Sequence, residues 1–113
     1  ETTVEFAIKS MPFYNTTPQP PCDAVIFRSK LAKAFHSLGD IWDLVDDLGK
    51  IKAPTLVLSG TDDPVTPLQD SIDIVERLPP DIVQFEVVKD TGHAPWRDKP
   101  EEAFAIIRAF ILA

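Results

Sequence analysis

The clearest hydrophobic pattern in the chain is a short apolar run at residues 53–60, which reads Ala-Pro-Thr-Leu-Val-Leu-Ser-Gly. Because proline and glycine bound this run and polar residues do not alternate with apolar ones, it predicts a strand buried on both faces of a parallel sheet. A second run, at residues 83–87, alternates Val83, Phe85 and Val87 with polar residues and predicts a second strand.

Apolar residues spaced three and four apart predict helices between and around these strands. One helix is expected over about 23–36, and a second over 40–48, which Gly49 ends. A third begins with Thr66 as N-cap and Pro67 as first helical residue, and it ends before two prolines at 79 and 80. Pro100 opens the last helix, whose apolar stripe comprises Phe104, Ile107 and Ile111, with Ala103, Ile106 and Phe110 beside it.

The order strand, loop, helix, strand, loop, helix is typical of a parallel α/β sheet. Two strands are too few for a sheet covered by helices on both faces. We therefore expect a partner chain, or a part of the protein outside these 113 residues, to supply the other strands.

Residues 1–48 differ from the rest. Pro18, Pro20 and Pro21 predict an irregular extended stretch, and residues 1–8 a short strand or a helix end. The chain accordingly divides into residues 1–48 and 49–113.

Composition narrows the classes of function. The apolar fraction of 44% suffices for the core of one small domain, and the net charge of −7 argues against nucleic acid as a partner. A single cysteine, Cys22, excludes an internal disulfide and a zinc site built on cysteine pairs. No apolar run approaches ~18 residues, so no membrane span is predicted, and no signal peptide is visible. We expect a soluble protein, cytoplasmic or secreted, and the initial Glu1 suggests a processed chain or a fragment.

Two residues with the chemistry of an acid and a base follow the predicted strands. Asp63 comes shortly after the first strand and His93 shortly after the second. Working residues of parallel α/β sheets lie on loops at the carboxyl ends of strands, so neighbouring strands would bring these side chains together. A carboxylate that accepts a hydrogen bond from one imidazole nitrogen leaves the other nitrogen free to act as a base.

Residues 51–67 resemble the acid-bearing segment of α/β-hydrolases, which reads I-x-x-P-[TV]-L-v-[IL]-x-G-x-x-D with P-x-x-P after the aspartate. The sequence Asp-Thr-Gly-His-Ala-Pro-Trp at 90–96 resembles the histidine loop of that family, and residues 98–104 resemble the start of its last helix. The resemblance covers residues 51–113, and its G-x-x-D spacing selects Asp63 over Asp62 as the acid. The acid loop, together with residues 11–16, looks most like the capped proline iminopeptidase-like group.

The resemblance implies the fold class: the C-terminal part of an α/β-hydrolase, with the last two parallel strands and their helices in residues 49–113 and the end of a helical cap in residues 1–48. It also implies a Ser-His-Asp triad to which this chain gives Asp63 and His93, without cofactor or metal. The substrate would be a small molecule or short peptide with an amide bond, as in aminopeptidases, or an ester bond. Epoxide hydrolases and dehalogenases, which use a carboxylate nucleophile, and a non-catalytic interaction domain on the same scaffold stay open as alternatives.

The nucleophile of such a triad is not found in this sequence. It sits in a G-x-S-x-G turn between a strand and a helix, and the nearest match, Phe35-His36-Ser37-Leu38-Gly39, lacks the first glycine and follows no buried strand. We therefore expect the missing N-terminal part or a second chain to carry it.

Simpler explanations apply to the remaining candidates. The aspartates at 40, 43, 46 and 47 near His36 read as a solvated helix face rather than a metal site. Asp63 alone would be explained as a turn residue before proline, and His93 as a loop histidine packed under Trp96. The two motifs together favour catalysis for both. Four aromatic residues of the first half are expected to pack within the cap: Phe13, Tyr14, Phe27 and Trp42.

Overall fold

The computed structural model describes residues 5, 9–17, 28–37 and 43–113 of the chain. The extended stretch predicted at Pro18–Pro21, most of the element predicted in residues 1–8 and the first part of the helix predicted over 23–36 lie outside these residues, as do Cys22, Phe27 and Trp42. Among the described helices, none has the length and apolar character needed to cross a membrane.

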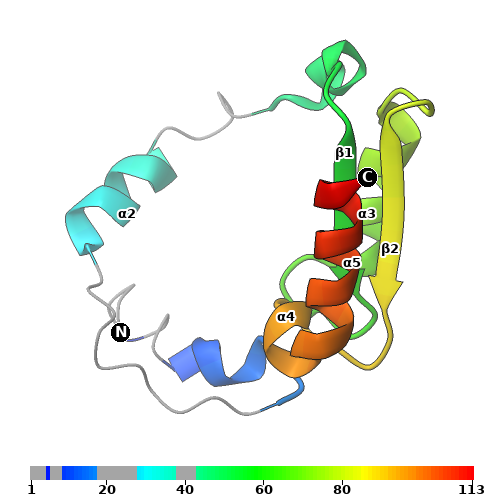
Figure 1. Ribbon diagram of the computed structural model, residues 1–113. Coiled ribbons are helices and arrows are strands. Elements are labelled where there is room, and N and C mark those ends of the chain that lie inside the picture. Colours follow the sequence, from blue (N-terminus) through cyan, green and yellow to red (C-terminus); the bar gives the residue numbers. More distant parts are fainter. Residues whose placement is uncertain (1–4, 6–8, 18–27, 38–42) are drawn as a thin grey trace.

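The centre of the described structure is a pair of parallel strands. Strand β1 (Thr55–Gly60) pairs with β2 (Val83–Val88) in a register that runs from Thr55 opposite Val83 to Gly60 opposite Val88. Helix α3 (Leu68–Arg77) connects the strands, and α5 (Pro100–Leu112) follows them. Figure 1 shows α5 in front of the two strands and α3 behind them. The predicted α/β order and the pairing of neighbouring parallel strands are therefore confirmed.

The beginning of α3 differs from the prediction. Pro67, not Thr66, occupies the N-cap position, with extended backbone (φ −52°, ψ 150°), and no side chain caps the helix. The hydroxyl of Thr66 turns back to Asp63 instead. The predicted end is confirmed: the helix stops at Arg77, and Leu78 is extended with ψ 149°, because the proline that follows disfavours helical backbone in the residue before it.

The C-terminal helix α5 begins at Pro100 as predicted and is preceded by a short helix, α4 (Pro95–Asp98), which the pattern did not reveal. Its predicted apolar residues are covered to different degrees, and Ile107 of the predicted stripe is half-buried. Ala103 is fully buried and Phe110 half-buried, whereas Phe104 and Ile111 are 56% and 71% exposed. The face through Ala103 and Phe110 is therefore the covered one.

The core that these elements form is small. The buried apolar residues among those described are Leu78, Val88, Ala94 and Ala103. Residues 55–58 of β1 are only half-buried, and Val87 of β2 is 37% exposed, so burial on both faces of the first strand and strict alternation in the second are not observed. The physical reason is the two-stranded sheet of the described residues, which gives each strand a single neighbour.

The described part of the first half includes three short helices: η1 (Met11–Phe13), α2 (Ser29–Ser37) and η3 (Val45–Lys50). Helix α2 confirms the described part of the helix predicted over 23–36. The helix predicted over 40–48 is wrong in its described part, where a 3-10 helix includes Gly49. The Asp43 carboxylate accepts a hydrogen bond from the Val45 amide (3.1 Å), and such local bonds compete with a regular helix. Helix η3 crosses the predicted boundary between residues 48 and 49, and it packs against α3. The division of the chain into residues 1–48 and 49–113 stays a prediction.

Candidate active site

Asp63 and His93 meet at the carboxyl ends of the two strands. The imidazole Nδ1 of His93 lies 2.9 Å from Oδ2 and 3.2 Å from Oδ1 of Asp63. The Asp63 side chain is 5% exposed and that of His93 41%. An ionised carboxylate only accepts hydrogen bonds, so Nδ1 carries a proton, and in the neutral imidazole Nε2 then has a lone pair available to act as a base. The acid is therefore covered and its basic partner is open to solvent.

The carboxylate of Asp63 is held by its own loop. Oδ1 accepts hydrogen bonds from the backbone amides of Val65 (2.8 Å) and Thr66 (3.0 Å), and Oδ2 accepts one from the Thr66 hydroxyl (2.8 Å). Burial raises the pKa of Asp63, but the hydrogen bonds from Thr66, His93 and Val65 outweigh it and hold the pKa below its usual value. The group is thus a charged, oriented acceptor at neutral pH.

The neighbouring Asp62 has a different position. Its side chain is exposed, and its backbone amide donates to the carbonyl oxygen of Thr91 (2.9 Å), which ties the acid loop to the histidine loop. As the sequence spacing predicted, Asp63 rather than Asp62 is the aspartate that the structure brings to His93.

The histidine loop packs so closely against its neighbours that Gly60 and Gly92 have no room for a side chain. A Cβ on Gly60, at the end of β1, would collide with the carbonyl oxygens of Thr91 and Gly92. A Cβ on Gly92 would collide with the Tyr14 carbonyl oxygen and lie 2.7 Å from the Cα of Asn15. The glycine of the Gly-His motif is therefore explained by the segment packed against it.

That segment, Tyr14 to Thr17, is the part of the site that sequence reasoning missed. The Tyr14 carbonyl oxygen accepts a hydrogen bond from the backbone amide of His93, and the side-chain oxygen of Asn15 accepts one from the amide of Ala94 (2.9 Å). The Tyr14 ring meets the His93 ring edge-on, with centroids 5.8 Å apart. The sequence predicted that Tyr14 packs within the cap, and the only signal for this contact was the Gly92 that makes room for it.

The other sequence candidates do not gather at this pair. Ser37 is exposed at the end of α2, where its hydroxyl donates to the Ala34 carbonyl oxygen (2.7 Å), and a helix end is not the strand-to-helix turn of a nucleophile. Among the described residues, no three metal-ligating side chains lie together. Asp40 and the side chain of His36 lie outside the described part.

Several solved structures resemble this chain, among them the following three. A thermophilic esterase from Thermogutta terrifontis is 33% identical, with a TM-score of 0.57 over 61% of this chain and 25% of that one. An N-acyl homoserine lactone degrading enzyme is 32% identical, with a TM-score of 0.57 over 61% and 26%. An α/β hydrolase from a Medee basin deep-sea metagenome library is 25% identical, with a TM-score of 0.64 over 77% and 32%. The chain thus spans about a quarter to a third of the length of each.

These likenesses confirm the predicted fold class, the C-terminal part of an α/β-hydrolase, but do not single out the proline iminopeptidase-like group. No protein of curated function matches the chain. The sequence profile of the serine aminopeptidases, S33, matches residues 20–100, which is most of the chain. The chain therefore belongs to the serine aminopeptidase S33 family of α/β-hydrolases.

Proposed function

We propose that this chain supplies the acid and the base of a Ser-His-Asp triad in a serine hydrolase. The observation that carries this proposal is the hydrogen bond from His93 Nδ1 to the covered carboxylate of Asp63, at the carboxyl ends of two parallel strands. His93 Nε2 would take the proton of an attacking serine and return it to the leaving group. Asp63 would orient the ring and stabilise the imidazolium that forms.

The serine lies outside this chain in our proposal, in the N-terminal part of the protein or in a second chain. Two features support it. The chain spans 25–32% of the length of the solved structures reported above, and large apolar side chains of α5 are uncovered, among them Phe104, Ile111 and Leu112. Contiguous exposed apolar surface of this kind marks a face that another part of a protein covers.

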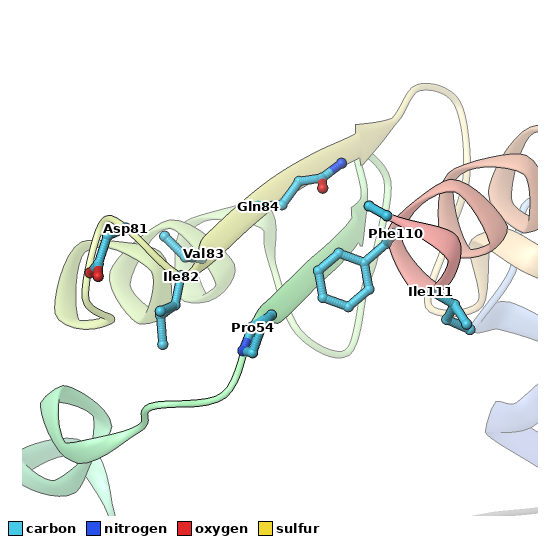
Figure 2. Close-up of a pocket in the computed structure, with 8 residues that line it drawn as sticks. Pro54, Asp81, Ile82, Val83, Gln84, Phe110 and Ile111 are labelled. Atoms are coloured by element: carbon cyan, nitrogen blue, oxygen red, sulfur yellow. The ribbon is translucent and has the colours of Figure 1, made fainter.

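A hollow at the opposite ends of the strands fits the same interpretation. Figure 2 shows it between the residues that precede the strands and the end of α5, with Phe110 directed toward Pro54. The apolar side chains that line it are joined by Asp81 and Gln84, and neither Asp63 nor His93 takes part. We assign this hollow to the surface covered by the rest of the hydrolase rather than to substrate.

We propose that the substrate is a carboxylic ester, in preference to an amide. The two solved structures above 30% identity are described as an esterase and as an enzyme that degrades N-acyl homoserine lactones, which are cyclic esters. The family description supports the amide alternative, in which the enzyme is an aminopeptidase. The finer resemblance to proline iminopeptidases stays a proposal within that alternative. Parallel assays with a p-nitrophenyl ester and a proline p-nitroanilide separate the two.

The pair is tested by His93→Ala and Asp63→Asn in the intact enzyme. We expect His93→Ala to abolish ester hydrolysis, and Asp63→Asn to lower kcat by about 10⁴, as in the serine protease triad, because the wrong imidazole tautomer would face the serine. Asp62→Asn is the matched control, since its exposed side chain lies outside the pair, and it should keep wild-type kcat. Near-normal rates in His93→Ala would refute the triad and favour a non-catalytic role for this chain within the enzyme.

A further inference from the structure

One carboxylate outside the acid–base pair collects backbone hydrogen bonds from two distant parts of the chain. Oδ2 of Asp98 accepts from the amides of Gly92 (2.7 Å) and Thr16 (3.0 Å), and Oδ1 accepts from the amide of Thr17 (2.7 Å). The short helix α4 turns Asp98 back toward the histidine loop. Asp98 therefore joins the loop before His93 to a segment about eighty residues earlier in the sequence.

These bonds complete the support of three consecutive amides. Gly92 donates to Asp98, His93 to the Tyr14 carbonyl oxygen and Ala94 to the Asn15 side chain. The backbone on both sides of the imidazole is thus fixed by Asp98 and by residues 14–17. We call Asp98 and residues 14–17 together the clamp. The ring itself is fixed by Asp63 on one atom and by the Tyr14 ring on its side.

We infer that Asp98 is a positioning residue for His93, which fastens residues 14–17 to the histidine loop and so holds the base in register with Asp63. This inference rests on the catalytic role proposed for His93. Bonds to an ionised acceptor are about twice as strong as neutral ones, and the amides of Gly92, Thr17 and Thr16 outweigh burial and keep the pKa of Asp98 below its usual value. The clamp is therefore charge-assisted at neutral pH.

The clamp also links catalysis to the part of the chain assigned to the cap. If residues 14–17 move away, His93 and Ala94 lose their acceptors and Asp98 loses two donors. The loss of these hydrogen bonds would displace His93 and slow the chemical step, because a displacement of about 1 Å in a catalytic group lowers rates by about 100-fold. The hydrogen bonds concerned all join groups of the protein to one another, so we expect substrate binding to change little.

The test is Asp98→Asn in the intact enzyme, with Asp90→Asn as the matched control. Asparagine at 98 removes the charge and turns one acceptor into a donor facing an N–H group. We expect kcat for a p-nitrophenyl ester to fall about 10- to 100-fold with KM within about threefold, and the NMR amide proton signals of Gly92, Thr16 and Thr17 to move upfield. Asp90 belongs to the same loop, its side chain is 68% exposed, and its positive φ of 54° suits asparagine, so Asp90→Asn should keep wild-type kcat.

A kcat for Asp98→Asn within twofold of wild type, in an enzyme that His93→Ala inactivates, would overturn the inference and leave the proposed triad intact. Activity that survives in His93→Ala would instead refute the triad itself. If Asp98→Asn does not fold, Asn15→Ala tests the clamp from its other side, since it removes only the acceptor for the Ala94 amide. An unchanged kcat in that variant would overturn the inference, and a drop of about tenfold at constant KM would support it.

Discussion

At the scale of single residues, the site depends on the hydrogen bonds that orient the Asp63 carboxylate toward His93. Three donors from the turn that follows it, two amides and the Thr66 hydroxyl, hold both oxygens before His93 adds its own bond. A preoriented acceptor needs no rearrangement when the imidazole becomes charged. Thr66 thus acts in the site through Asp63, and its hydroxyl also lies 3.4 Å from His93 Nδ1.

This role predicts the effect of Thr66→Val, which keeps the shape of the side chain and removes the hydroxyl donor. Hydrogen bonds to charged groups contribute about 1.5–3 kcal/mol, so we expect kcat/KM of the intact enzyme to fall about tenfold or more. Thr66→Ser, which keeps the hydroxyl, should stay close to wild type. Equal rates in both variants would show that the hydroxyl does not matter to Asp63.

At the scale of elements, the carboxyl end of β1 and the histidine loop are packed backbone against backbone. The Gly60 position leaves no room for a Cβ, because carbonyl oxygens of the histidine loop occupy that space. We expect Gly60→Ala to destabilise the intact enzyme by about 1–3 kcal/mol, the usual cost of overpacking, in urea-induced unfolding. Gly49→Ala is the control, since its Cβ would meet only the Arg77 carbonyl oxygen at 3.8 Å. Equal stability of the two variants would contradict the close packing described here.

Some features of these elements could be predicted from the sequence, and others depend on tertiary packing. The strands, the end of α3 before Pro79 and the start of α5 at Pro100 follow from local rules on apolar runs and proline, and the meeting of Asp63 with His93 follows from the geometry of parallel strands. The contact of residues 14–17 with Asp98 joins positions too far apart for any periodicity to record. The sequence could not tell that Ala103 is buried and Phe104 exposed, because both are apolar and only tertiary packing distinguishes them.

At the scale of the whole molecule, two carboxylates with lowered pKa values make stability depend on pH. Asp63 and Asp98 bind protons less readily in the folded than in the unfolded protein. Their stabilising contribution is therefore complete above the unfolded pKa, about 3.9, and is lost as the pH falls through the lower folded values. We expect the stability difference between wild type and Asp98→Asn in urea unfolding to shrink from pH 6 to pH 3. A difference that is constant over this range would contradict the lowered pKa of Asp98.

The central claim is decided at the scale of the whole molecule, because the proposed triad needs a serine that we place outside this chain. The most direct measurement is labelling of the intact enzyme with a fluorophosphonate probe, followed by mass spectrometry of its peptides. We predict that one serine outside these 113 residues is labelled and that His93→Ala abolishes the labelling. Absence of labelling in the active enzyme, or a label on a serine of this chain such as Ser37, would contradict the account.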